Sequence, residues 1–149
     1  MKLLAIAAAV AATTLATAPA FAAHIHGTPH DDNLHGTAYN DVIYGLGGDD
    51  TLFGRRLNDH LYGGAGNDFL IDGAGRDFVS GGKGADIFNV RGGGDVVVSG
   101  RGKDSILLYH DGAADTVRCG AGVDRVQYTG DLELHDVFRH CEHVDPYSP

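Results

Sequence analysis

Large apolar side chains recur at every ninth position along most of the chain. The period holds from Leu34 to Ile106 without interruption, and it resumes after a two-residue slip at Leu108 and Tyr109. An Asp precedes each of these apolar residues by two positions. A fixed period of this length matches neither a helix nor a long strand, and it is typical of a solenoid in which each repeat supplies one short strand and one turn. The pattern therefore predicts an all-β repeat fold. The apolar places are Leu34, Ile43, Leu52, Leu61, Leu70, Val79, Phe88, Val97, Ile106, Val117 and Val126.

Three consecutive repeats between Gly63 and Asn89 give the clearest view of the unit: GGAGNDFLI, DGAGRDFVS and GGKGADIFN. Glycine occupies the second and fourth places, Asp the sixth and a large apolar residue the eighth. We expect six residues to form a turn and three to form a strand. Glycine permits positive φ, so the turn can aim its carbonyl oxygens inward, and Asp adds carboxylate oxygens. Calcium takes about six to eight oxygen ligands, which makes these turns candidate calcium sites.

This motif resembles the RTX, or haemolysin-type, calcium-binding nonapeptide repeat. The resemblance implies a right-handed parallel β-roll with two nonapeptides per coil and calcium ions between turns that are neighbours along one edge. Neighbours on an edge are then eighteen residues apart. One edge would carry Asp50, Asp68, Asp86 and Asp104, and the other Asp41, Asp59, Asp77 and Asp95.

The same resemblance implies that these eight aspartates are the metal ligands, and about three to six calcium ions follow from the plausible same-edge pairs. Turn carbonyls would complete each site. The glycines around which those carbonyls lie are Gly45, Gly48, Gly64, Gly66, Gly73, Gly75, Gly82, Gly84, Gly93 and Gly102.

Some repeats depart from the motif. The unit Gly54–Tyr62 has Arg55 and Leu57 where glycines are expected, which predicts a weak or absent ion site. Asp72, Val90 and Ser99 replace glycine at the first place, which puts individual ions in doubt without threatening the fold. The first two units carry Thr at the second place, and we interpret residues 23–44 as a degenerate N-terminal cap, because terminal repeats of solenoids are usually atypical.

The segment Met1–Ala22 is expected to be a secretory signal peptide. Lys2 provides the charged start, Leu3–Leu15 the apolar core, and Ala20–Ala22 a cleavage site of the small-x-small type. A membrane anchor is the alternative, but the apolar run is short for a span, and no later stretch is long and apolar enough to cross a bilayer. We therefore expect a secreted, extracellular protein. The predicted organisation is a signal peptide over 1–22, a cap over 23–44, a core roll over 45–107, and degenerate repeats with a C-terminal cap over 108–149.

Two cysteines, Cys119 and Cys141, are the only ones in the chain. In an exported protein such a pair predicts a disulfide, which would close a loop of about twenty residues and contribute roughly 3 kcal/mol. Zinc held by both cysteines with His140 and His143 is the rival interpretation. The tail resembles that of small secreted actinobacterial calcium-binding proteins of the RTX type.

Charge and motifs narrow the function. The chain has 20 acidic and 11 basic residues and a net charge of −9, so nucleic acid is a poor partner. No recognisable catalytic motif occurs, and we expect no enzyme activity. His24, His26, His30 and His35 could bind zinc or copper, or could simply be solvated at the N-terminal edge.

Two functions remain. The first is a calcium-binding roll that folds on binding, because only one place in nine is expected to be buried. The second is a calcium-stabilised module that recognises an extracellular glycan or protein through outward-facing residues. Tyr44 and Tyr62 would lie on one face, one coil apart, and Phe53 and Ile71 on the other. Simple stacking between neighbouring strands is the alternative role for these side chains, and an ice-binding roll is a remote variant of the module.

Overall fold

The computed structural model describes residues 22–130 and 135–148, and it builds them from short strands without a helix in that part of the chain. Residues 1–21 of the predicted signal peptide lie outside the described residues. The strands are β1 (His24–His26), β2 (Asn33–His35), β3 (Val42–Gly47), β4 (Thr51–Arg56), β5 (His60–Ala65), β6 (Phe69–Ala74), β7 (Phe78–Lys83), β8 (Ile87–Val90), β9 (Val96–Gly102), β10 (Ser105–Tyr109), β11 (Thr116–Gly122), β12 (Arg125–Thr129), β13 (Val137–Arg139) and β14 (His143–Pro146).

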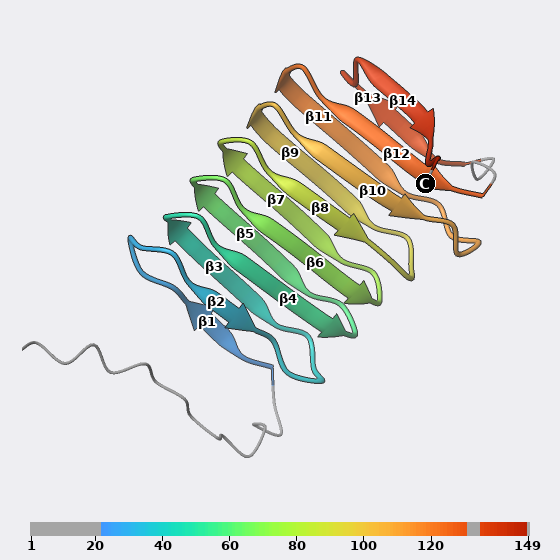
Figure 1. The fold of residues 1–149 in the computed structure, drawn as a ribbon. Coiled ribbons are helices and arrows are strands. Elements are labelled where there is room, and N and C mark those ends of the chain that lie inside the picture. Colours follow the sequence, from blue (N-terminus) through green and yellow to red (C-terminus); the bar gives the residue numbers. More distant parts are fainter. Residues whose placement is uncertain (1–21, 131–134, 149) are drawn as a thin grey trace, which may run out of the picture.

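Alternate strands belong to two parallel sheets. The order in one sheet is β1-β3-β5-β7-β9-β11-β13, and in the other β14-β12-β10-β8-β6-β4-β2. Each strand pairs with the strand two further along the chain, so that Ile43 is level with Leu61 and Leu61 with Val79. Two nonapeptides therefore make one coil, and the coils stack from the N-terminal to the C-terminal end (Figure 1). This confirms the predicted parallel β-roll architecture.

The strands are longer than the sequence predicted. Most central strands have six residues, as in β5 and β6, and they include the seventh to ninth places of one unit and the first three of the next. The expectation of a six-residue turn and a three-residue strand was wrong, because the glycine positions at the start of each unit continue the ladder. Gly64, for example, is level with Leu46 and Gly82 in the neighbouring strands. Only the fourth to sixth places are left to turn the chain.

The core lies between the two sheets and is formed by two columns of side chains. The eighth-place residues from Ile43 to Val126 are buried, as predicted. The first place also points inward, which the sequence analysis did not anticipate: Val90, Ser99, Leu108 and Cys119 are 0–3 % exposed. The expectation of one buried place in nine was therefore too low. It failed because glycine fills this column in the N-terminal half and conceals it.

The two-residue slip at Leu108 and Tyr109 is accommodated in a turn. Leu108 is level with Val90 and with Tyr128, so it occupies the first place of its unit. The extra residues therefore enlarge the turn that follows β10, and the register of the sheet is kept. Consequently the sequence distance between paired strands rises from eighteen to twenty residues, as between Val97 and Val117.

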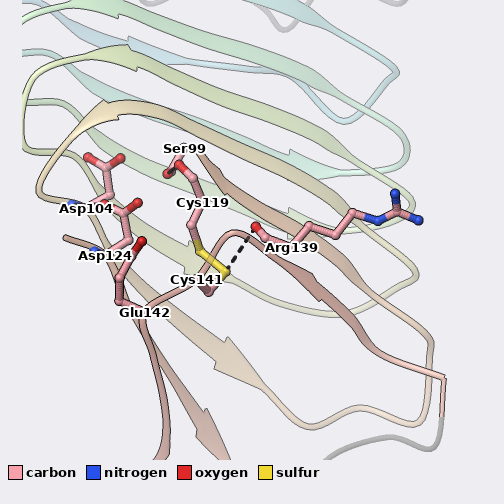
Figure 2. The surroundings of a disulfide bond; sticks show 7 residues. All are labelled: Ser99, Asp104, Cys119, Asp124, Arg139, Cys141 and Glu142. Atoms are coloured by element: carbon pink, nitrogen blue, oxygen red, sulfur yellow. Dashed lines mark hydrogen bonds between the residues drawn. A yellow bond between two sulfur atoms is a disulfide. The ribbon is translucent and has the colours of Figure 1, made fainter. Parts of the chain in front are cut away.

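A disulfide between Cys119 and Cys141 joins the C-terminal strands to the last regular coils, with a Cα–Cα distance of 5.1 Å. Figure 2 shows the bond beside Ser99, whose hydroxyl donates to the Cys119 carbonyl. The predicted disulfide is thus present, and the alternative zinc site is wrong because neither thiol is free.

The outer faces carry stacked rings. Tyr44 and Tyr62 stack with centroids 4.9 Å apart and an interplanar angle of 9°. Phe53 is level with Ile71 on the other sheet, so both predicted outward pairs are one coil apart. His26 stacks on Tyr44 and His35 on Phe53, on opposite sheets, so these two histidines do not converge on one metal ion.

None of the described segments is a helix long and apolar enough to span a membrane.

Candidate metal centre

The sixth-place aspartates form two ladders, one along each edge of the roll. In each ladder, the Oδ1 atom of one Asp accepts a hydrogen bond from the backbone N–H of the Asp one coil earlier, which is eighteen residues away, or twenty where the insertion intervenes. Asp86 Oδ1 accepts from Asp68 N–H at 2.9 Å, and Asp104 Oδ1 accepts from Asp86 N–H at 3.0 Å. The other edge repeats this arrangement, with Asp77 accepting from Asp59 at 2.7 Å. The predicted division of the aspartates between two edges is therefore observed.

The second carboxylate oxygen of most of these residues is buried and has no hydrogen-bond partner. A buried carboxylate oxygen without a partner is costly, because desolvation is not compensated. Such an atom, repeated in turn after turn, therefore calls for a cation, and hard oxygen ligands suit calcium. The ladder residues whose Oδ2 atoms are in this condition are Asp50, Asp59, Asp68, Asp77, Asp86, Asp95, Asp104 and Asp124, and Asp72, which lies outside the ladders at a first place, shares it.

Glycine permits the close approach of successive turns. Gly66 has a φ of 135°, and a Cβ atom placed on it would stand 1.9 Å from the Gly48 carbonyl oxygen one coil away. No L-residue fits there without displacing the backbone. In the unit that lacks glycines, Arg55 and Leu57 nevertheless adopt φ values of 89° and 66°. That turn keeps the shape of its neighbours, and Asp59 keeps its place in the ladder.

The electrostatics of the metal-free roll are unfavourable to ionised carboxylates. Burial raises the pKa of Asp86 to about 7, and the carboxylates of Asp68 and Asp104 add to the rise, while the hydrogen bond from Asp68 opposes it. Burial likewise raises the pKa of Asp59 to about 7 and that of Asp95 to about 8. Each edge of the roll therefore attracts either protons or cations.

Comparison with protein families agrees with this chemistry. A family model described as "RTX calcium-binding nonapeptide repeat (4 copies)" matches residues 26–61, 54–88 and 62–97. Residues 26–97 are RTX calcium-binding nonapeptide repeats. No match was found among curated proteins or among solved structures.

The first two RTX units satisfy their aspartates in a different way. Thr37 donates its backbone N–H to Asp41 Oδ2 at 2.5 Å, and its hydroxyl lies 3.0 Å from the same oxygen. Thr28 does the same for Asp32, at 2.5 Å and 2.9 Å. The second-place Thr therefore occupies the oxygen that is unpartnered in the later RTX units. Asp41 belonged to the sequence-predicted ligand set, and it is the member of that set whose Oδ2 is already hydrogen-bonded.

Two residues beyond the RTX match continue the ladders. Asp136 Oδ1 accepts from Asp115 N–H, and a Glu142 carboxylate oxygen accepts from Asp124 N–H, both at 2.9 Å. Figure 2 shows Asp104, Asp124 and Glu142 following one another along one edge. Sequence analysis missed both residues, because an insertion stretches the Asp115–Asp136 spacing to twenty-one residues and Glu replaces Asp at the other.

A second ladder runs along the outside of the turns at the fifth place. Asp49 Oδ1 accepts from Asn67 N–H at 2.7 Å, and Asn67 Oδ1 accepts from Ala85 N–H at 2.8 Å. On the opposite edge Asn58 Oδ1 accepts from Arg76 N–H at 2.8 Å. These bonds hold neighbouring RTX turns together without a metal. A signal was present in the sequence, because Asp or Asn fills the fifth place of the first five units.

One RTX unit has a carboxylate at the first place. Asp72 is 1 % exposed and lies inside the roll. One carboxylate oxygen of Asp72, one of Asp77 and one of Asp95 all lie within 4.8 Å of one another. The sequence analysis treated Asp72 only as a departure from glycine, whereas the structure places it beside two predicted ligands.

Proposed function

We propose that this protein is an exported calcium-binding roll that folds when calcium binds between successive turns. The observation that carries the proposal is the row of buried Oδ2 atoms without hydrogen-bond partners. In the proposal, the ligands are the predicted aspartates other than Asp41, together with Asp124 and carbonyl oxygens of the glycine turns. Asp41 is left out because Thr37 already satisfies its Oδ2 atom.

The ion count follows from neighbouring unpartnered carboxylates. On one edge these form four successive pairs from Asp50 to Asp124, and on the other two pairs from Asp59 to Asp95. One ion in each pair would give the upper end of the expected range of about three to six ions. Because the pairs share carboxylates, the binding of neighbouring ions should be coupled.

Calcium would reverse the electrostatics that oppose folding. Neighbouring strands in a sheet are about 4.8 Å apart. Two carboxylates at about 5 Å repel by roughly 3 kcal/mol at an effective dielectric of 20. An ion between them replaces that repulsion with attraction, so binding free energy becomes folding free energy. At neutral pH we therefore expect the calcium-free chain to be largely unfolded.

The test is far-ultraviolet circular dichroism of the mature chain, first in chelator and then with calcium raised into the millimolar range. A coil spectrum should change cooperatively to a β spectrum. Magnesium should fail to replace calcium, because it requires a smaller and more regular octahedral site. The same β spectrum in chelator and in calcium would refute calcium-driven folding, and dialysis that detects no bound calcium would refute the binding function itself.

Export is supported by the disulfide between Cys119 and Cys141, since such bonds persist in oxidising compartments outside the cytosol. The measurement is N-terminal sequencing of the protein recovered from culture medium. A chain that begins at Ala23 would agree with the predicted signal peptide, and retention of the intact protein in the cytosol would refute export.

Recognition of an extracellular glycan or protein remains a prediction. The outward rings of His26, Tyr44 and Tyr62 form a continuous stack on one sheet, which could accept a partner, but the stacking itself accounts for their presence. An immobilised-glycan pull-down with and without calcium distinguishes the two roles.

A further inference from the structure

The first place of each RTX unit lies against the carboxylate of its own sixth place. A Cβ atom placed on Gly63 would stand 2.3 Å from Asp68 Oδ2, and one on Gly81 would stand 2.3 Å from Asp86 Oδ2. Glycine at the first place therefore leaves space for the Oδ2 atom of the sixth-place Asp. In the unit between them the first place is Asp72, so a second carboxylate enters the space that is empty in its neighbours.

The Asp72 side chain is held in a fixed orientation. Its Oδ1 atom accepts hydrogen bonds from Gly73 N–H at 2.5 Å and from Arg91 N–H at 2.9 Å. Its Oδ2 atom is buried and has no partner. The carboxylate is therefore anchored by one oxygen, and the other is free to bind a ligand.

Asp77 and Asp95 present the same arrangement. Asp77 Oδ1 accepts from Asp59 N–H, and Asp95 Oδ1 accepts from Asp77 N–H, while both Oδ2 atoms are buried without partners. Three buried carboxylates thus meet within 4.8 Å. Oxygens that surround one calcium ion at about 2.3–2.6 Å are at most about 4.6–5.2 Å apart, so one ion can contact all three.

A buried proton is the competing explanation for Asp72. A protonated carboxyl could donate one hydrogen bond to Asp77 or Asp95, but a single proton would satisfy only two of the three carboxylates. A divalent cation can compensate all three at once. A third carboxylate also adds charge and rigidity to a calcium site, and both properties increase its affinity.

We propose that Asp72, Asp77 and Asp95 hold one calcium ion at a buried three-carboxylate site, which is the tightest site in the roll. The proposal rests on the calcium-binding function proposed above, and it predicts the order in which the ions dissociate. When free calcium falls, the ion at this site is the last to leave.

Native mass spectrometry of the mature chain tests that order, after equilibration at stepwise lower concentrations of free calcium set by a chelator. The wild-type chain should pass through a plateau at which one ion remains. Asp72→Asn keeps the side-chain shape but removes the charge, and it should raise the calcium concentration at which the last ion leaves by at least tenfold. Asp72→Gly restores the glycine of the neighbouring units, so it should abolish the plateau while the total number of ions stays the same.

The matched control is Asp145→Asn, which removes one exposed charge from β14 and should leave the plateau unchanged. An unchanged plateau in Asp72→Asn and in Asp72→Gly would overturn the proposal and indicate that Asp72 holds a proton. If Asp72→Asn fails to fold, the plateau measured for Asp72→Gly tests the proposal by itself, because glycine is the residue that most neighbouring units have at this place. A wild-type chain that binds no calcium would instead refute the underlying function, so the two failures are distinguishable.

Discussion

Replacement of Asp86 separates the two roles that each ladder aspartate combines. Its Oδ1 atom accepts the backbone N–H of Asp68, and its Oδ2 atom is the proposed calcium ligand. Asp86→Ala removes both roles. Asp86→Asn keeps a side-chain oxygen that can accept the Asp68 N–H but removes the charge that attracts the ion.

The magnitudes follow from these contacts. Leaving the buried Asp68 N–H without an acceptor costs about 1–3 kcal/mol. Loss of one ion costs about 2.7 kcal/mol when calcium is present at a hundred times its dissociation constant. Asp86 belongs to two of the proposed pairs, with Asp68 and with Asp104, so its replacement can release one ion or both. At that concentration, Asp86→Asn should lower the free energy of unfolding by about 3 kcal/mol if one ion is lost and by about 5 kcal/mol if both are lost, and Asp86→Ala should add about 1–3 kcal/mol to either value.

The assay is urea unfolding in calcium, followed by far-ultraviolet circular dichroism, with calorimetry to count bound ions. Asp145→Asn and Asp145→Ala are the controls, since Asp145 is exposed and lies outside both ladders. If Asp86→Asn unfolds with the wild-type free energy and binds as many ions, Asp86 is not a ligand. If the two Asp86 variants lose the same free energy, the ladder hydrogen bond contributes nothing to stability.

Three further predictions concern other parts of the roll. Thr37→Val removes the hydroxyl beside Asp41 and should lower the free energy of unfolding in urea by about 1–3 kcal/mol without changing the number of bound ions. The control Thr51→Val, on the outer face, should change the free energy of unfolding little. Loss of an ion in Thr37→Val would contradict the inference that Thr37 satisfies Asp41 without a metal. Removal of the Cys119–Cys141 disulfide should lower the free energy of unfolding by about 3 kcal/mol, measured in calcium with and without reductant, and equal stability in both would contradict it. The buried carboxyls of the metal-free roll have pKa values of about 6 to 9, against an ordinary value of 3.8, so at intermediate pH the roll binds protons that the unfolded chain has released. The stability of the metal-free roll should therefore fall as pH rises from about 4 to 9. Over the same range the affinity for calcium should rise, because the ligands lose their protons. Circular dichroism in chelator measures the first pH dependence, and calcium titrations at several pH values measure the second. A metal-free roll that becomes more stable with rising pH would refute this reasoning.

The coil geometry could be predicted because the sixth and eighth places of the repeat hardly vary. An unbroken period of nine from Leu34 to Ile106 fixes which residues share a sheet and an edge, and the hydrogen bond from Asp68 to Asp86 follows from that spacing. The prediction failed where the period breaks or the residue type changes. Asp136 lies twenty-one residues after Asp115 and is placed by the pairing of β13 with β11, which the nine-residue period does not predict. Glu142 keeps the eighteen-residue spacing from Asp124 and was missed because its residue type is Glu and not Asp.

The burial of the first place could not be predicted for a different reason. Glycine has no side chain, so a column of glycines has no hydrophobic pattern and looks like part of a turn. The non-glycine residues at this place then look like defects. In the structure, Val90 and Leu108 pack in the core, and Asp72 meets two other carboxylates. A departure from a repeat motif is thus best interpreted by asking which space the motif residue leaves empty.

Differences among the units at the first and second places divide the roll into parts that differ in their need for metal. In the N-terminal units Thr28 and Thr37 satisfy the ladder carboxylates without an ion. In the C-terminal half Val90 and Leu108 add a second buried apolar column, at roughly 1.5–3 kcal/mol for each side chain. The three units between Gly45 and Ile71 have glycine at the first place and unpartnered carboxylates at the sixth, so they have neither source of stability, and they lie outside the proposed three-carboxylate site. Calcium dependence should therefore be greatest in these three units, where hydrogen exchange in limiting calcium would detect the first coils to open.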